Sequence, residues 1–147
     1  MRKAIHHAID VDARPDAIWR VFADLSTWPS WFPFADSARA DGDPWRAGGR
    51  IDVQLRVPVV GTLPLRLAVA EASAPSLARW TGGALGVRGD HRYTFDDRGK
   101  WTRVTSHETF SGAFAFVLPR AAFGRIDEAA HDSLAKLKAL VENRSTG

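Results

Sequence analysis

The sequence of 147 residues contains no cysteine. Disulfide bonds, thiolate zinc sites and a cysteine nucleophile are therefore excluded. A long apolar run is also missing, because the most apolar stretch, FSGAFAFVLPRAAF at 110–123, is interrupted by Gly112, Pro119 and Arg120 and is too short to cross a bilayer. No apolar run follows the first basic residues, so we expect no signal peptide and a soluble, cytoplasmic protein without a transmembrane segment.

The motifs of several enzyme classes are missing as well. There is no G-x-S-x-G elbow of a serine hydrolase. The glycines of GGALGVRG open no helix, so a dinucleotide site is not expected. No two histidines have H-x-H or H-x-x-x-H spacing, and the adjacent His6 and His7 point to opposite faces of a predicted strand. We therefore expect neither a metal site nor a cofactor.

Charge of one sign is not concentrated anywhere in the chain. Twenty lysines and arginines are interleaved with 17 acidic residues, which gives a net charge of +3. This pattern indicates a solvated basic surface and predicts no nucleic-acid partner. The composition, 45% hydrophobic and 25% charged, is typical of a globular protein. We expect residues 1–147 to form one domain.

The periodicity of apolar residues predicts an α+β protein. Residues 3–12 alternate as in a half-buried strand, and 15–23 have helical spacing after Pro15. A second helical turn is expected around 27–31, and the apolar stripe of 119–143 predicts a long helix. The strands expected between these helices have hairpin-length connections, which indicates an antiparallel sheet; they are 50–58, 63–73, 76–82, 90–97 and 100–112.

This arrangement predicts an internal cavity. An antiparallel sheet buries one face, and only the long helix and the short helices are available to cover it. A strongly curved sheet around one helix leaves a gap unless very large side chains fill it.

Several motifs follow one another along the chain: Pro15, Ile18-Trp19, Trp28-Pro29-Ser30-Trp31-Phe32-Pro33, Gly49, LARWTG and HRYTFDDRGKWTRVTSHETFSG. In this order they resemble the START-like/Bet v 1-like (SRPBCC) superfamily and its polyketide cyclase/dehydrase-type members. The resemblance extends over about residues 3–142. It implies a helix-grip fold, in which a seven-stranded antiparallel sheet wraps around the C-terminal helix and leaves a hydrophobic cavity. The superfamily includes allergens, sterol carriers, aromatase/cyclases and coenzyme Q-binding proteins, so the fold does not fix the function.

The aromatic segment WPSWFPF at 28–34 has two interpretations. Trp28, Trp31 and Phe32 either line the wall or mouth of the cavity or plug one end of the sheet. Burial of one large aromatic side chain is worth about 1.5–3 kcal/mol, so several of them could close this end without a ligand.

Polar residues on otherwise apolar strand faces are candidates for a site. Alternation places His91 and Tyr93 beside Phe95, and Ser106 and Glu108 beside Val104 and Phe110. A turn centred near 97–99 sets residue 91 opposite 105–107, so that His91, Ser106 and Glu108 become cross-strand neighbours. We expect His91 and Glu108 to orient a polar group of the ligand. The alternative is a structural pair, with Glu108 held by an arginine such as Arg56 or Arg92.

The sequence predicts a protein that binds a small hydrophobic or aromatic molecule, lipid-like or polyketide-like. One alternative is a cofactor-independent cyclase or dehydratase that uses His91, Glu108 and Tyr93. Another is a partner module akin to coenzyme Q-binding or toxin-like relatives. His7 is expected at the end of a strand, and His6, His107 and His131 on the surface. The remaining candidate ligand contacts, which could equally be core, are Leu55, Leu67, Trp80, Phe110, Phe114, Phe116 and Phe123.

Overall fold

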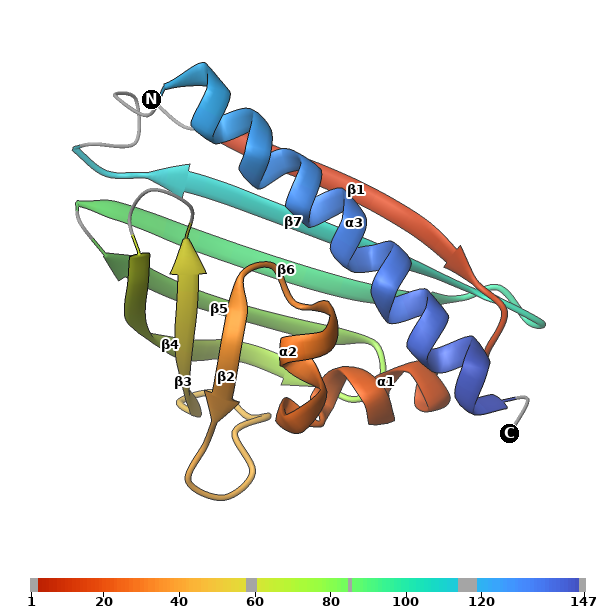
Figure 1. The fold of residues 1–147 in the computed structure, drawn as a ribbon. Coiled ribbons are helices and arrows are strands. Elements are labelled where there is room, and N and C mark those ends of the chain that lie inside the picture. The colour runs from red at the N-terminus through yellow and green to blue at the C-terminus, as the bar shows by residue number, and fades with distance from the viewer. Residues whose placement is uncertain (1–2, 58–60, 85, 114–118, 146–147) are drawn as a thin grey trace.

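A seven-stranded antiparallel sheet curves around one long helix (Figure 1). The computed structural model describes residues 3–57, 61–84, 86–113 and 119–145. The strand order is β1-β7-β6-β5-β4-β3-β2, which confirms the α+β helix-grip fold. The elements are β1 (Lys3–Val11), α1 (Pro15–Ala23), η1 (Leu25–Thr27), α2 (Trp28–Trp31), β2 (Ala35–Arg39), β3 (Arg50–Val57), β4 (Gly61–Ser73), β5 (Leu77–Ala84), β6 (Val87–Asp97), β7 (Thr102–Ser111) and α3 (Arg120–Ser145).

Two features of the sheet differ from what the alternation of apolar residues in the sequence predicts. Strand β2 was not expected from its own residues, because five residues with a bulge between Ala35 and Ser37 show no clear alternation. The turn between β6 and β7 is longer than expected, since Asp97 pairs with Thr102. The register is therefore shifted, and His91 lies opposite Glu108 rather than opposite 105–107.

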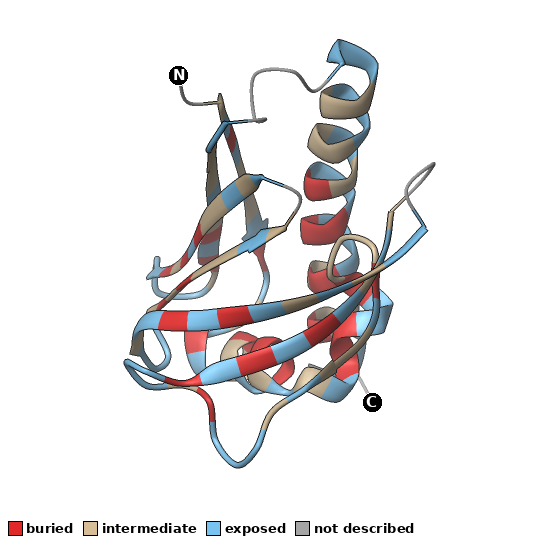
Figure 2. Cartoon of the chain, turned by 90° about the vertical axis from the view of Figure 1, so that its left-hand side faces the viewer, coloured by how far each residue is buried: buried red, intermediate tan, exposed pale blue. Residues whose placement is uncertain are grey.

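The strands bury alternate residues, as a sheet with one covered face requires. Figure 2 shows buried and exposed positions following one another along the strands. On β6 the inward residues are His91, Tyr93 and Phe95, and all three are buried. The outward residues form ion pairs between strands, such as Arg79 with Asp90.

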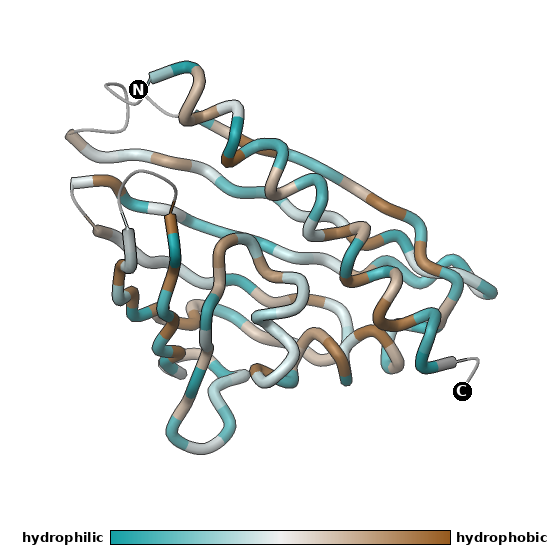
Figure 3. Tube along the Cα trace, viewed as in Figure 1, coloured by the Kyte–Doolittle hydropathy of each residue, from teal (hydrophilic) through white to brown (hydrophobic). Residues whose placement is uncertain are grey.

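Helix α3 crosses the concave face of the sheet, and only its second half is packed tightly. Its buried residues are Ala130, Leu134, Leu137 and Val141, at spacings of three and four, together with Ser133. Apolar and polar residues alternate along it in Figure 3, as expected for a helix with one covered side. None of residues 120–129 is buried. The helix therefore closes one end of the sheet more completely than the other.

An aromatic cluster fills the closed end, where α1 and α2 pack below α3. Phe22 is at its centre, with ring centroids 5.0 Å from both Tyr93 and Phe95. Trp28 and Trp31 are buried, and their indole nitrogens donate to the carbonyl of Phe22 at 2.9 Å and the hydroxyl of Thr27 at 3.0 Å. Because both indole groups have acceptors, these side chains are buried without an unmet polar group.

The hydroxyl of Thr27 connects α1 to the aromatic segment. It donates to the carbonyl of Val21 at 2.8 Å and accepts from Trp31. We expect Thr27→Val to lower the free energy of unfolding by about 1–3 kcal/mol, because the buried indole N–H loses its acceptor. Urea unfolding monitored by tryptophan fluorescence measures this change.

Two variants serve as controls for Thr27→Val. Thr27→Ser keeps the hydroxyl, and Ser26→Ala removes an exposed one, so both should lose clearly less stability than Thr27→Val, and Ser26→Ala should stay within about 0.5 kcal/mol of the parent. A Thr27→Val variant as stable as Ser26→Ala would show that the Trp31 hydrogen bond does not contribute.

Candidate functional site

A cavity of about 180 Å³ lies between the sheet and the first half of α3. A second space of about 200 Å³ adjoins it and continues along the β5–β6 hairpin, with Trp80, His91 and Glu108 common to both. The walls are formed mainly by carbon. The residues that line the first space are Phe32, Pro33, Phe34, Val53, Leu55, Val57, Leu65, Leu67, Trp80, His91, Glu108, Phe110, Ile126 and Ala130.

The local backbone explains why the space stays open. Phe34 has a φ of 60°, a left-handed conformation that is unusual for a bulky residue, and it turns the chain from α2 into β2 beside the cavity. Gly82 and Gly89 face each other on β5 and β6 and bring no side chain into the second space. A Cβ atom at Gly82 would lie 2.8 Å from the end of the Leu67 side chain, so a larger residue there would require Leu67 to shift.

The polar part of the cavity is a hydrogen-bonded group on β6 and β7. The Nε2 atom of His91 lies 2.7 Å from the hydroxyl oxygen of Ser106, and its Nδ1 atom lies 3.5 Å from a carboxyl oxygen of Glu108. With the ring proton on Nδ1, the hydroxyl of Ser106 donates to Nε2 and the N–H of His91 faces Glu108. Ser106 therefore fixes the orientation of the imidazole ring.

Burial changes the titration of this group. Desolvation lowers the pKa of His91 to about 3, so that the ring is neutral. Desolvation also raises the pKa of Glu108 to about 7. The Glu108 side chain is 23% exposed, and it lines both spaces. The site thus holds one carboxyl that exchanges its proton near neutral pH, beside a neutral imidazole.

Tyr93 lies deeper than the cavity. Its hydroxyl is buried and has no hydrogen-bond partner of good geometry. Burial raises the pKa of Tyr93, and the nearby hydroxyls of Ser106 and Ser133 lower it by less than burial raises it. Neither Tyr93 nor Ser106 lines the cavity. A Ser106–His91–Glu108 arrangement is therefore not a hydrolase triad that a substrate in this cavity can reach, because the serine oxygen lies behind the histidine.

The structure brings about half of the expected contact residues to the cavity. Phe32, Trp80, His91 and Glu108 line it with three others expected from the sequence, Leu55, Leu67 and Phe110. Trp28 and Trp31 belong instead to the aromatic cluster. Phe123 packs against Phe110, with ring centroids 6.1 Å apart, but does not line either space. Phe114 and Phe116 lie outside the described residues.

The alternative partners expected for Glu108 are engaged elsewhere or point away. Arg56 forms an ion pair with Asp36 at 2.9 Å. Arg92 is exposed and lies opposite His107 on the outer face of the sheet. No described arginine or lysine forms an ion pair with Glu108, and the basic group recorded beside it is the neutral imidazole of His91.

Several lining residues were missed by the sequence reading. They include Pro33 and Phe34 in the aromatic segment, Ile126 and Ala130 on α3, and the glycines of the β5–β6 hairpin. Two signals could have identified them. The glycines of GGALGVRG interrupt a strand pattern, which indicates close approach or an open face. Ile126 and Ala130 belong to the apolar stripe of α3 itself.

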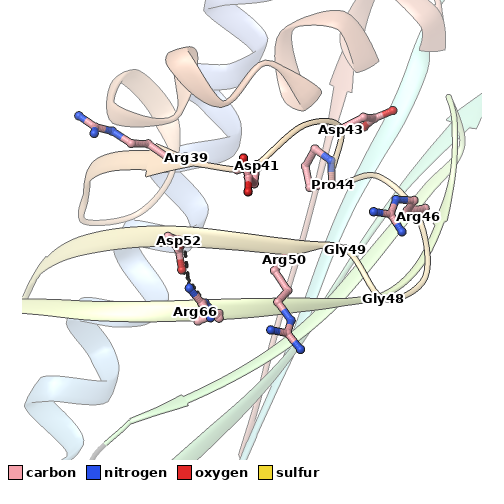
Figure 4. A pocket seen from close by; sticks show the side chains of 11 residues that line it. Arg39, Asp41, Asp43, Pro44, Arg46, Gly48, Gly49, Arg50, Asp52 and Arg66 are labelled. Atoms are coloured by element: carbon pink, nitrogen blue, oxygen red, sulfur yellow. Dashed lines mark hydrogen bonds and ion pairs between the residues drawn. The ribbon is translucent and has the colours of Figure 1, made fainter.

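A larger hollow lies outside the space between the sheet and α3. It has a volume of about 530 Å³ and surrounds the loop between β2 and β3 (Figure 4). The side chains of Arg39, Arg46 and Arg50 point in different directions in Figure 4, and Arg66 is held by Asp52 at 2.8 Å. These charges do not converge on one point, so this open groove is not the candidate site.

The histidines outside the cavity are placed near the surface. His7 is half-buried on β1 and lies 2.7 Å from the carboxylate of Asp127 on α3. His6, His107 and His131 are exposed. Within residues 3–57, 61–84, 86–113 and 119–145 no cluster of side chains is suited to hold a metal ion. None of the helices in these ranges is both long and apolar enough to span a membrane.

The seven-stranded sheet around α3 defines a helix-grip protein, and the family match supports the Bet v 1-like (SRPBCC) superfamily. More narrowly, the chain belongs to the family described as polyketide cyclase/dehydrase and lipid transport, whose model matches residues 2–142. No curated protein matches the sequence.

Solved structures with low sequence identity share this fold. The protein TTHA0849 from Thermus thermophilus is 17% identical, with a TM-score of 0.77 and coverage of 97% of this chain and 99% of that one. The ZhuI aromatase/cyclase from Streptomyces sp. R1128 is 15% identical, with a TM-score of 0.75 and coverage of 99% and 96%. Ara h 8.0201 is 10% identical, with a TM-score of 0.75 and coverage of 97% and 99%. At these identities the likeness extends to the fold alone.

The raised pKa of Glu108 has a consequence for stability. A carboxyl that holds its proton more tightly in the folded state favours folding at low pH, and this contribution disappears as pH rises through the folded pKa of about 7. We expect the stability of the parent relative to Glu108→Gln to fall by about 2 kcal/mol between about pH 5 and about pH 8. Urea unfolding of both proteins across this range measures the difference.

The parent and Glu108→Gln share every other titrating group, so the contributions of those groups to the pH dependence of stability cancel in the difference between the two proteins. Glu71→Gln, which removes an exposed carboxylate of β4, should follow the parent at each pH. A constant difference between parent and Glu108→Gln would contradict the raised pKa.

Proposed function

We propose that this protein binds a small, largely hydrophobic or aromatic molecule in the space between its sheet and α3. The observation that supports the proposal is the uneven filling of the space between the sheet and α3. Aromatic side chains occupy one end of this space, and the other end keeps an apolar cavity with few polar groups. Ligand sites are typically of this kind. An apolar cavity of about 150 Å³ accommodates benzene, so the two adjoining spaces have room for a molecule of one to three rings.

The family description, which includes lipid transport and polyketide cyclases, supports a ligand of this class. Binding would derive from burial of apolar surface, worth roughly 25 cal/mol per Å², and from orientation of one polar group by Glu108 and His91. A location in the cytoplasm and a single domain over the whole chain are further proposals from the sequence.

A second candidate is acid–base catalysis on the bound molecule. The observation that favours it is the Glu108 carboxyl, which exchanges its proton near neutral pH inside the cavity. Glu108 and His91 are the candidate catalytic groups. Tyr93 loses support as a third, because its hydroxyl does not reach the cavity.

The partner-module alternative receives no support from the segment that suggested it. Such a module presents an exposed apolar patch, whereas Trp28 and Trp31 are 0% and 2% exposed.

A substitution that fills the cavity tests the proposed function. Leu65 on β4 lines both spaces, and a tryptophan there would occupy them. We expect Leu65→Trp to weaken binding of the neutral probe N-phenylnaphthylamine by about tenfold or more, measured by the rise in probe fluorescence. Native mass spectrometry of freshly purified parent and variant would show in parallel whether a guest co-purifies only with the parent.

Ala68→Trp is the matched control, because Ala68 lies on the same strand and is exposed on the outer face. This variant should bind the probe as the parent does. Equal binding by parent, Ala68→Trp and Leu65→Trp, with all three folded by circular dichroism, would show that the cavity is not the binding site.

A further inference from the structure

The cavity contains a carboxyl group to which no described residue donates a hydrogen bond. The polar side-chain atom recorded beside Glu108 is Nδ1 of His91, which is 3.5 Å away, beyond good hydrogen-bond geometry. A carboxylate in a site lined by carbon is unfavourable unless a partner satisfies its oxygens. The unfilled acceptor positions of Glu108 therefore favour a donor brought by the ligand.

No described side chain that lines the cavity carries a positive charge. Besides Glu108, the polar groups of the described walls are the imidazole of His91 and the indole nitrogen of Trp80. The imidazole is neutral at physiological pH, because burial holds its pKa at about 3, so it does not repel a cation. A ligand anion would meet the Glu108 carboxylate without any cation to offset the repulsion.

The charged and titratable groups on neighbouring elements have contacts other than Glu108. On β1, Ile5 is the residue opposite Glu108. Its neighbours on that face are His7, which is bonded to Asp127 of α3 at 2.7 Å, and Lys3, whose amino group lies 5.2 Å from the ring centroid of Phe123. His131 of α3 stacks edge-on against His7. None of these groups forms an ion pair with Glu108 among the described residues.

Aromatic rings border the same space as the carboxyl group. Phe32, Trp80 and Phe110 line the same space, and the face of an aromatic ring attracts a cation, most strongly when water is excluded. The carboxylate and the rings therefore favour the same kind of guest.

We infer that the ligand carries a protonated amine on its apolar or aromatic body and that Glu108 receives this amine. The inference rests on the proposed function, since it specifies the chemical class of the molecule in the same cavity. The ammonium group would donate to the Glu108 oxygens, and the apolar body would extend along Leu55, Leu65 and Leu67.

A matched series of ligands tests the inference. Phenethylamine, phenethyl alcohol and hydrocinnamate share a ring and a short chain and differ in a cationic, neutral or anionic end. By isothermal titration calorimetry at about pH 8 we expect the amine to bind about tenfold or more tighter than the alcohol, and the acid to bind most weakly. In Glu108→Gln the preference for the amine over the alcohol should disappear.

The pH dependence provides an independent readout. In the absence of ligand the pKa of Glu108 is about 7, so its carboxyl is mostly protonated at about pH 6 and mostly ionised at about pH 8. Binding of a cation requires the proton to leave. Affinity for the amine should therefore fall several-fold from about pH 8 to about pH 6. The alcohol should show no such change. Glu71→Gln, an exposed control on β4, should behave as the parent throughout.

The outcomes separate this inference from the proposed function. If the alcohol or the acid binds as tightly as the amine, or if Glu108→Gln keeps the preference for the amine, the inference that the ligand carries an amine is wrong. The cavity would still be a ligand site. If none of the three binds the parent, the amine inference fails, and the N-phenylnaphthylamine comparison of Leu65→Trp with Ala68→Trp decides the proposed function separately.

Discussion

The packing of Phe22 against the inner face of the sheet is the contact on which the rest of the structure depends. The Phe22 ring meets Tyr93 and Phe95 from the sheet and Trp31 from the aromatic segment, while its carbonyl accepts the indole N–H of Trp28. This cluster fills the space below the second half of α3. Because α3 is one straight element over a curved sheet, filling one end leaves the other end open, and that open end is the cavity.

The cavity leaves space unfilled inside the protein and exposes two polar side chains to apolar surroundings. Interiors are normally packed to crystal-like density, and the described walls here leave two connected spaces among leucines, valines and aromatic rings. The polar side chains that enter them, His91 and Glu108, have titration behaviour set by burial, which makes one neutral and raises the pKa of the other. An unfilled apolar space with an unsatisfied carboxyl is unfavourable for stability alone, which supports a role in binding.

The sequence predicted the elements with strong periodicity and located the others less well. Helices α1 and α3 and strand β1 follow from apolar spacing; α1 has the expected bounds, and those of β1 and α3 differ by one or two residues. Strand β2 is defined by its pairing with β3, which a five-residue segment does not reveal. The inward positions of His91 and Glu108 followed from alternation, whereas their direct opposition depended on the length of the turn after Asp97.

The sequence by itself determined the class of fold, the side of each strand that is buried and the aromatic character of the segment after α1, because these depend on local periodicity. The tertiary structure decided which aromatic rings fill the interior and which border a cavity. Trp31 is adjacent to Phe32 in the sequence and Trp28 lies four positions before it, yet the two tryptophans enter the core and Phe32 lines the cavity. The ionisation of Glu108 likewise depends on solvent exclusion by several distant segments, which local sequence does not contain.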